Sequence, residues 1–286
     1  MRVFVTGATG YVGTAVVERL LAVGHAVAGL ARSGEAEARV RAAGADPVRG
    51  ELGDLGVLAA AARDADAVVH AGATGRPGQD AVDAAAVDAL LEALAGSGKA
   101  LVYTSGLWVL GDTGDRVAAE DAPLAPAALV AWRAEVERGV LSAAGVRGVV
   151  VRPGIVYGRG GGIPGGMVAQ GRKKGVVRYV GDGSQRVNPV HVEDLADLYL
   201  LALEAPAGTV LHGVSATVAT RELAEAAAAA AGARAEAWPL EEARAVLGPY
   251  ADALALDQRV SSEVARGMGW RPSRAGVVEE LRGSSA

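Results

Sequence analysis

Residues 3–13 read VFVTGATGYVG, and this stretch decides the fold of the chain. A short apolar run is followed by glycines at positions 7, 10 and 13 and by a pattern that predicts a helix over 12–23. A strand, a glycine-rich turn and a helix in this order form a dinucleotide site, in which the glycines permit the tight turn, close approach of the pyrophosphate and close helix packing. The N–H groups at the helix start then bind phosphate. The predicted contacts are Gly7, Thr9, Gly10, Tyr11, Val12 and Gly13.

Outward from this stretch, short apolar runs alternate with amphipathic stretches over the first 155 residues. This alternation is typical of a parallel sheet covered by helices, whose βαβ crossovers are almost always right-handed. We therefore predict an α/β fold: a Rossmann-type doubly wound parallel sheet with a smaller, mainly helical C-terminal substrate-binding region. In this context the glycines indicate a nucleotide site rather than a tight turn without a ligand. The predicted strands cover 3–6, 26–30, 46–49, 67–71, 101–105, 148–152 and 209–212.

The predicted domain organisation follows from the same alternation of strands and helices. A dinucleotide-binding domain over 1–155 is completed by 190–214, while 156–189 and 215–286 are expected to form the substrate-binding region. The glycine-rich segment 158–166 has few side chains to pack, so we expect a mobile loop or lid there.

Composition excludes several classes of protein. The chain has 286 residues and no cysteine, which excludes disulfides, thiolate metal sites and a cysteine nucleophile, and its four histidines are too scattered for a zinc cluster. A net charge of −5 argues against nucleic acid as the main partner. No uncharged apolar run approaches the ~20 residues of a membrane-spanning helix, and the N-terminus has no signal-peptide pattern. We therefore expect a cytoplasmic protein with no metal and no membrane partner.

The spacing Gly-x-x-Gly-x-x-Gly resembles that of the short-chain dehydrogenase/reductase superfamily, in the extended branch of epimerases, dehydratases and dihydroflavonol reductases. Segments 65–73, 151–158 and 188–196 resemble the family's fourth strand, the segment beside the nicotinamide and the motif that starts the next helix. The resemblance covers residues 1 to about 205. It implies further cofactor contacts at Glu51, Leu52, Ala71, Gly72, Ala73, Thr104, Arg133, Pro153, Gly154, Ile155 and Val156.

The end of the second strand bears on the choice of dinucleotide. In an NAD site an acid at this place bonds the ribose 2′-hydroxyl, whereas an arginine suits the 2′-phosphate of NADP. Here the chain has no carboxylate, and Arg32 with Ser33 could form a phosphate pocket. We therefore predict NADP (NADPH) as the cofactor rather than NAD; the alternative is that Arg32 is an ordinary solvated arginine. Leu52 matches the family position that packs on adenine, or is an ordinary core leucine.

The family's usual catalytic pair, a tyrosine and a lysine four residues later, is missing. None of the six tyrosines has a lysine at that spacing, and only Lys99, Lys173 and Lys174 are lysines at all. Residues 129–137 resemble the family's active-site helix, and this alignment puts Arg133 in place of the lysine, with leucine in place of the tyrosine. The usual serine position is taken by a glycine, although a shift by one restores Ser105.

Three functions remain open. We favour an NADP-dependent reductase of a small metabolite, in which Arg133 grips the ribose and the proton comes from water, the substrate or another side chain. The alternatives are a non-redox lyase, isomerase or cyclase on the same scaffold, and a catalytically inactive NADP-sensing binding protein. The candidate catalytic residues are Ser105, Asp112, Arg133, Tyr157 and His191.

The resemblance also suggests where the substrate binds and how the chain assembles. The candidate pocket residues are Trp108, Met167, Tyr179, Arg186 and Asn188, although the two aromatics are explained equally well as core residues. Residues 79–95 form an almost wholly apolar helix pattern, which favours a covered outer face and a homodimer.

Overall fold

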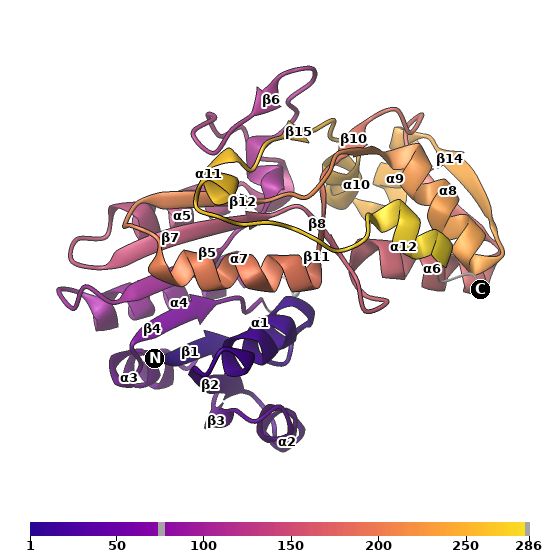
Figure 1. Cartoon of the computed structure of the whole chain (residues 1–286). Helices are drawn as coiled ribbons and strands as arrows, with labels where there is room; N and C mark the ends of the chain where they lie inside the picture. The colour runs from indigo at the N-terminus through magenta and orange to yellow at the C-terminus, as the bar shows by residue number, and fades with distance from the viewer. Residues whose placement is uncertain (74–77, 284–286) are drawn as a thin grey trace. The chain divides into compact units, whose positions relative to one another are not determined.

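The computed structural model describes residues 1–73 and 78–283 (Figure 1). The chain divides into two compact units. The units consist, first, of Met1–Ser105, Trp132–Val151 and Ala196–Leu211 and, second, of Gly106–Ala131, Arg152–Leu195 and His212–Ala286. The predicted domain boundaries stay a prediction, because compactness does not by itself show that a unit folds alone.

The central sheet has seven strands in the order β12-β7-β5-β4-β1-β2-β3. All neighbouring pairs from β3 to β7 are parallel. The strand order reverses between β1 and β4, and ligands of doubly wound sheets bind at the carboxyl ends of the strands at such a point. The predicted α/β fold class is confirmed, and every predicted strand lies within one residue of the observed one. The strands are β1 (Arg2–Thr6), β2 (Ala26–Ala31), β3 (Asp46–Arg49), β4 (Ala67–His70), β5 (Ala100–Thr104), β7 (Arg147–Pro153) and β12 (Thr209–Gly213).

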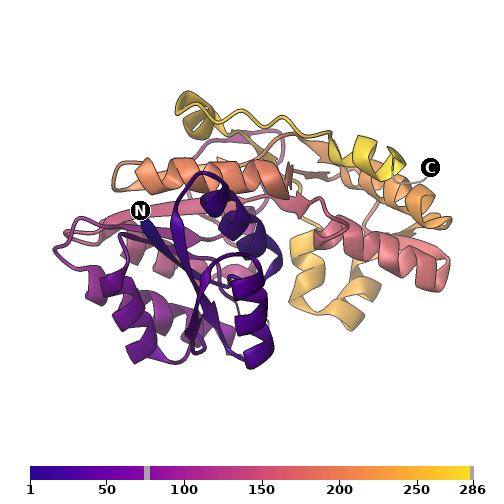
Figure 2. The ribbon, with the colours of Figure 1, turned by 60° about the horizontal axis from the view of Figure 1, so that its bottom comes forward.

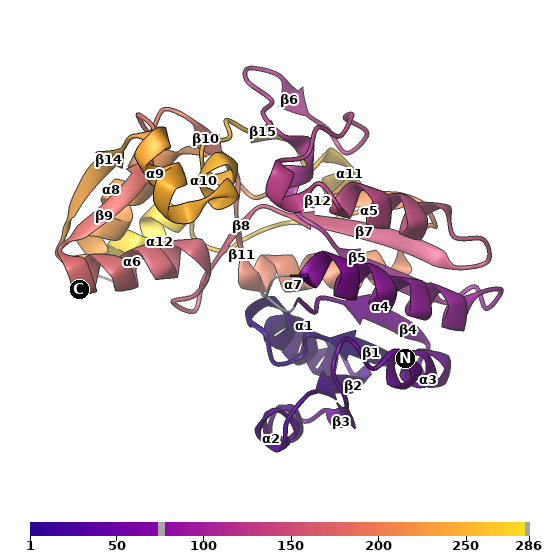
Figure 3. The ribbon, with the colours of Figure 1, turned by 180° about the vertical axis from the view of Figure 1, so that it is seen from behind.

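Helices cover both faces of this sheet. In Figure 1, α1 (Tyr11–Ala22) and α7 (Val192–Glu204) lie in front of the strands, and an ion pair between Arg19 and Asp197 joins them. Figure 3 shows α4 (Gln79–Leu94) and α5 (Arg133–Ser142) on the opposite face. The remaining helices of this unit are α2 (Gly34–Ala42) and α3 (Leu55–Asp64).

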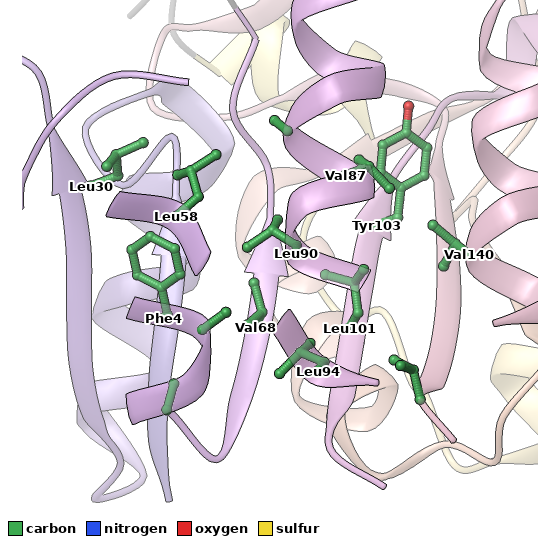
Figure 4. Close-up of a cluster of buried hydrophobic side chains, with 14 of the residues drawn as sticks. Phe4, Leu30, Leu58, Val68, Val87, Leu90, Leu94, Leu101, Tyr103 and Val140 are labelled. Atoms are coloured by element: carbon green, nitrogen blue, oxygen red, sulfur yellow. The ribbon is translucent and has the colours of Figure 1, made fainter. Parts of the chain in front are cut away.

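An apolar core lies under α3, α4 and α5. Phe4, Leu58, Leu90, Leu101 and Val140 are all fully buried in one cluster (Figure 4). Alanine is frequent on α3 and α4, and its small side chain lets these two helices lie close together. The same cluster contains Tyr103 (Figure 4), whose ring is buried while its hydroxyl donates to Asp83.

The second unit combines helices with four two-stranded sheets, which pair β8 with β11, β9 with β14, β10 with β13 and β6 with β15. Helices α6 (Gly162–Lys174) and α12 (Val277–Gly283) both pack beside α8 (Thr220–Ala231) (Figure 2). The strands are β6 (Val117–Ala118), β8 (Ile155–Tyr157), β9 (Val176–Val180), β10 (Arg186–Val187), β11 (Pro189–His191), β13 (Val218–Ala219), β14 (Arg234–Trp238) and β15 (Arg259–Val260). The helices are η1 (Leu107–Leu110), η2 (Ala128–Val130), α6 (Gly162–Lys174), α8 (Thr220–Ala231), α9 (Leu240–Leu247), α10 (Pro249–Leu254), α11 (Glu263–Gly267) and α12 (Val277–Gly283).

The glycine-rich segment 158–166 is not a loop throughout, so that prediction is wrong for its second half. Helix α6 begins at Gly162 because small residues let it pack closely. A Cβ on Gly165 would lie 2.1 Å from the Gly160 oxygen, and one on Gly171 would lie 2.7 Å from the Ala231 Cβ of α8. The glycine-rich composition predicted a loop, whereas Gly165 and Gly171 allow α6 to lie close to Gly160 and to α8. Within residues 1–73 and 78–283, no helix has the length and apolarity needed to cross a bilayer.

Candidate functional site

The turn between β1 and α1 has the geometry of a phosphate-binding loop. Gly7 has a φ of +68°, and a Cβ there would lie 2.5 Å from the Ala71 oxygen. A Cβ on Gly13 would lie 2.0 Å from the Gly7 oxygen, so no larger residue fits at either place. The N–H of Gly10 donates to the Gly7 oxygen at 2.8 Å and closes the turn. Gly10 is also the N-cap of α1 and has no side chain to cap the helix, which leaves the N-terminus suited to an anion.

The segment after β4 lies against this loop at the point where the strand order reverses. Gly72 donates its N–H to Thr6 Oγ1 at 3.1 Å. A Cβ on Gly72 would lie 2.9 Å from Leu52 Cδ2, so Leu52 packs on this glycine and is half-buried. Ala73 and Glu51 are exposed, and the Glu51 N–H donates to Asp54 Oδ2 at 2.8 Å. Leu52, Gly72 and the glycine loop thus form one continuous wall, which fits a flat base beside a pyrophosphate.

The end of β2 carries Arg32 and Ser33. Ser33 Oγ accepts from the Ala36 N–H at 3.1 Å and caps α2, so the serine has a structural role there. Arg32 is exposed, and no carboxylate of the described residues pairs with it. By contrast, Glu37 in the first turn of α2 is neutralised by Arg49 at 2.9 Å, and this hydrogen bond lowers the pKa of Glu37. The strand end therefore presents an uncompensated cation.

Arg133 is held at the carboxyl end of β5. Its Nη1 donates to the Thr104 oxygen at 2.8 Å and to the Tyr103 hydroxyl at 2.9 Å. Its Cζ lies 4.4 Å from the centre of a Trp132 ring. The predicted helix over 129–137 is wrong at its start, because Leu129 lies in the 3-10 turn η2 and α5 begins only at Arg133.

Ser105 follows β5 directly and carries a polar atom without a partner. Its N–H donates to the Val151 oxygen at 2.8 Å, but its Oγ is buried and makes no hydrogen bond to any described residue. Leaving a buried hydroxyl unpaired costs about 1–3 kcal/mol, which a ligand oxygen would offset. The neighbouring Thr104 Oγ1 is bonded to the Tyr199 hydroxyl at 2.7 Å, and burial raises the pKa of Tyr199.

A buried polar chain that ends at Arg133 was not predicted from the sequence. Tyr103 OH donates to Asp83 Oδ2 at 2.9 Å, and His70 Nε2 lies 3.1 Å from Asp83 Oδ1. Thr6 Oγ1 lies 3.1 Å from His70 Nδ1. The available signal was that Asp83 precedes Val87 and Leu90 by four and seven residues and so shares a helix face with them, where a buried carboxylate needs partners.

Two predicted catalytic residues, Tyr157 and His191, lie together in the second unit. Their ring centres are 5.2 Å apart, and His191 Nε2 lies 3.3 Å from Glu280 Oε2. Tyr157 OH donates to the Ala275 oxygen at 2.6 Å, and burial raises the pKa of Tyr157 to about 12. Tyr157 and Glu280 border a pocket of about 210 Å³ at the start of α6. Asp112, in contrast, is exposed and accepts from the Gly114 N–H at 3.0 Å in a turn.

The predicted nicotinamide segment lies in the same unit. A Cβ on Gly154 would lie 1.8 Å from the Asn188 oxygen, and the Ile155 N–H donates to that oxygen at 2.9 Å. Pro153 is the last residue of β7, while Ile155 and Val156 belong to β8. These glycine and strand contacts fix the segment to β11.

The predicted substrate residues are mostly engaged within the second unit. Arg186 donates from Nε to Asp257 Oδ1 at 2.8 Å, and this hydrogen bond lowers the pKa of Asp257. Asn188 is buried and donates to the Gln258 oxygen at 3.0 Å. Trp108 packs edge-on against Tyr250. Met167 and Tyr179 pack around Val177.

Comparison with known proteins places this geometry in a family. The sequence model of the NAD dependent epimerase/dehydratase family matches residues 3–213. An uncharacterized protein of Schizosaccharomyces pombe is 33% identical over 98% of both chains, and a 2-alkyl-3-oxoalkanoate reductase of Stenotrophomonas maltophilia is 32% identical over 72% of this chain and 66% of its own. The UDP-glucose 4-epimerase of Thermus thermophilus, solved with NAD, superposes with a TM-score of 0.76 at 26% identity and covers 99% of this chain and 97% of its own. The match covers the phosphate-binding loop and the sheet from Val3 onward, and the chain belongs to the NAD dependent epimerase/dehydratase family, in the extended short-chain dehydrogenase/reductase superfamily.

Proposed function

We propose that this protein is an NADP-dependent oxidoreductase that reduces a small metabolite without a tyrosine–lysine pair. The observation that carries the proposal is Arg133, which stands in place of the family's lysine and is fixed to the end of β5 by its bond to the Thr104 oxygen. The relatives add support, since two of them are named as a 2-alkyl-3-oxoalkanoate reductase and a ketoreductase.

The first unit offers groups for each part of the dinucleotide. The glycine loop and the N-terminus of α1 suit the pyrophosphate. Arg32 supplies an unpaired positive charge for a 2′-phosphate, which favours NADP over NAD. Arg133 uses only Nη1 in its bonds to Tyr103 and Thr104. Among the described residues nothing accepts from its Nη2 or Nε, so these donors remain for ribose hydroxyls.

The cofactor would supply the hydride, and the reduction also needs a source for the proton. The Arg133 guanidinium offers hydrogen-bond donors and no acceptor, so its part is to position groups. Tyr103 cannot act as the acid, because its hydroxyl is fully buried and donates to Asp83, and burial raises its pKa. The unpartnered Ser105 Oγ is suited to orient a substrate oxygen. A proton from water or the substrate suffices for an activated double bond or an imine, since neither forms an alkoxide at the hydride acceptor.

A second candidate is an NADP-sensing protein without turnover. It is favoured by the commitment of both tyrosine hydroxyls near Arg133: that of Tyr103 to Asp83 and that of Tyr199 to Thr104. A non-redox lyase, isomerase or cyclase is the third candidate, because the same scaffold hosts such chemistry.

A substrate panel separates these candidates. The purified protein is mixed with NADPH and with enones, imines and ketones of small size, and the loss of reduced-nicotinamide absorbance is followed. We expect turnover with an enone or imine and slower turnover with simple ketones. Tight NADPH binding without any turnover would support the sensor, and product formation with no net change of NADPH would support the non-redox enzyme.

A further inference from the structure

Resting on the proposed function, we infer that Asp83 is a positioning residue at the centre of a buried hydrogen-bond chain. This chain connects Gly72, beside the glycine loop, to Arg133. The chain runs from the Gly72 N–H through Thr6, His70, Asp83 and Tyr103 to the Arg133 guanidinium. All of these residues belong to one compact unit. Their proposed role is to orient the groups that bind the cofactor.

The side chains of this hydrogen-bond chain are buried, so each of their polar atoms needs a partner. The exposed fractions of Thr6, His70, Asp83 and Tyr103 are 0%, 1%, 4% and 0%. Water therefore does not replace a lost partner, and each polar atom must find one within the protein. Asp83 lies in α4, on the helix that also buries Val87 and Leu90, where an aspartate without partners would be strongly disfavoured. The two donors that face Asp83 remove that penalty.

The hydrogen bonds around Asp83 have one consistent assignment of donors and acceptors. An ionised carboxylate only accepts hydrogen bonds, so Tyr103 O–H and His70 Nε2–H both donate to it. The Tyr103 oxygen is then free to accept from Arg133, which has donors only. On the other side, a neutral His70 accepts at Nδ1 from the Thr6 hydroxyl, and the Thr6 oxygen accepts from the Gly72 N–H. Asp83 thereby fixes the His70 tautomer and the rotation of both hydroxyls.

Both ends of the chain reach groups that the proposed function uses. At one end, the Gly72 segment lies against Leu52 and next to the glycine loop. At the other, Arg133 keeps Nη1 on Tyr103 and Thr104 and leaves its remaining donors for the ribose. A fixed arginine binds more tightly than a mobile one, because less side-chain freedom is lost on binding. Asp83 therefore acts on cofactor affinity through Tyr103, without touching the cofactor.

A substitution at Tyr103 separates the effect of its hydrogen bonds from the effect of its packing. Its ring stacks on His70 with centroids 5.9 Å apart, and Tyr103→Phe keeps the ring while it removes the hydroxyl. Asp83→Asn keeps the shape but replaces one acceptor by a donor, which conflicts with the donors that face it. Asp88→Asn changes an exposed acid on the same helix and is the matched control.

The test measures NADPH dissociation constants by fluorescence titration together with thermal unfolding. For Asp83→Asn and Tyr103→Phe we expect a Kd about tenfold higher, the equivalent of about 1.4 kcal/mol, and for Asp88→Asn no change. A folded Tyr103→Phe variant that binds NADPH like the wild type overturns the proposal.

Nitrogen NMR of His70 in the wild-type protein supplies a second readout that does not depend on any variant. The expected signals are those of a ring that carries its proton on Nε2, which faces Asp83, and none on Nδ1, which faces the Thr6 hydroxyl. A doubly protonated ring, or a proton on Nδ1, overturns the assigned direction of the chain. If the wild type fails to bind NADPH at all, the proposed function is wrong. The NMR result still tests the assigned donors and acceptors of the hydrogen-bond chain.

Discussion

Arg133 donates from Nη1 to the backbone oxygen of Thr104 at 2.8 Å, which fixes the first residue of α5 to the last residue of β5. A lysine has a single ammonium group on a flexible stem, whereas the planar guanidinium bonds Thr104 and Tyr103 from one nitrogen and keeps further donors. This arrangement places a cation at the end of β5, where the proposed function needs one in place of the family's lysine.

Replacement of Arg133 is expected to weaken cofactor binding. Arg133→Ala removes the cation and should raise the NADPH Kd about 10- to 100-fold, because a hydrogen bond to a charged group is worth about 1.5–3 kcal/mol. Arg133→Lys should recover only part of this loss. Isothermal titration measures both, with Arg138→Ala on the exposed side of α5 as the control. Equal affinity of Arg133→Ala and Arg138→Ala for NADPH would contradict the assigned role.

Arg32 is expected to select the cofactor. Arg32→Ala should raise the Kd for NADPH about tenfold or more and leave the Kd for NADH unchanged, because only NADPH carries the 2′-phosphate. Arg39→Ala changes an exposed arginine of α2 and should affect neither. The assignment is lost if the wild type binds NADH and NADPH with equal affinity.

Two glycines of the first unit should respond oppositely to alanine. Gly13→Ala places a Cβ 2.0 Å from the Gly7 oxygen and should destabilise the fold by about 3 kcal/mol and abolish NADPH binding. Gly139→Ala lies in α5 with no atom within 4 Å of its new Cβ, so it should stabilise the protein by about 1 kcal/mol. Urea unfolding measures both changes. A Gly13→Ala variant as stable as the wild type would refute the tight loop.

His212 is expected to make the protein sensitive to acid. Burial, together with the positive charge of Arg152, lowers the pKa of His212 to about 3. The unfolded chain therefore binds more protons than the folded one between pH 6.5 and 3, so stability falls as the pH falls through that window, by at most about 1.4 kcal/mol per pH unit. Burial raises the pKa of Glu120 in the same cluster, which acts in the opposite sense.

Comparison of variants isolates the histidine. His212→Gln should flatten the fall in unfolding free energy below pH 6.5. Denaturant unfolding at a series of pH values measures these slopes. Parallel curves for His212→Gln and the wild type would show that His212 is not the responsible group.

The sequence predicted the elements whose signal is local. Glycine spacing at 7, 10 and 13 identified the loop, and the buried parallel strands appeared as continuous apolar runs. Arg133 was predicted to contact the cofactor from the resemblance of its surroundings, and this stays a prediction. In each case a few adjacent residues contain the physical cause.

The sequence did not predict features that depend on tertiary contacts. Asp83 lies 13 residues from His70 and 20 residues from Tyr103 along the chain, and only the packing of α4 on the sheet brings them together. The first turn of α6 was predicted as a loop because glycine is a poor helix former, whereas its contacts with Gly160 and α8 outweigh that preference. For the same reason the start of α5 at Arg133, held by Thr104, was not visible in the local pattern.

The central claim is that the protein transfers hydride although it lacks the tyrosine–lysine pair. The most direct test uses NADPH deuterated at the transferred position, an accepted enone or imine, and mass spectrometry of the product. The account predicts one deuterium at the reduced carbon in the wild type and loss of this product in Arg133→Ala. Product that carries no deuterium would contradict hydride transfer from the cofactor.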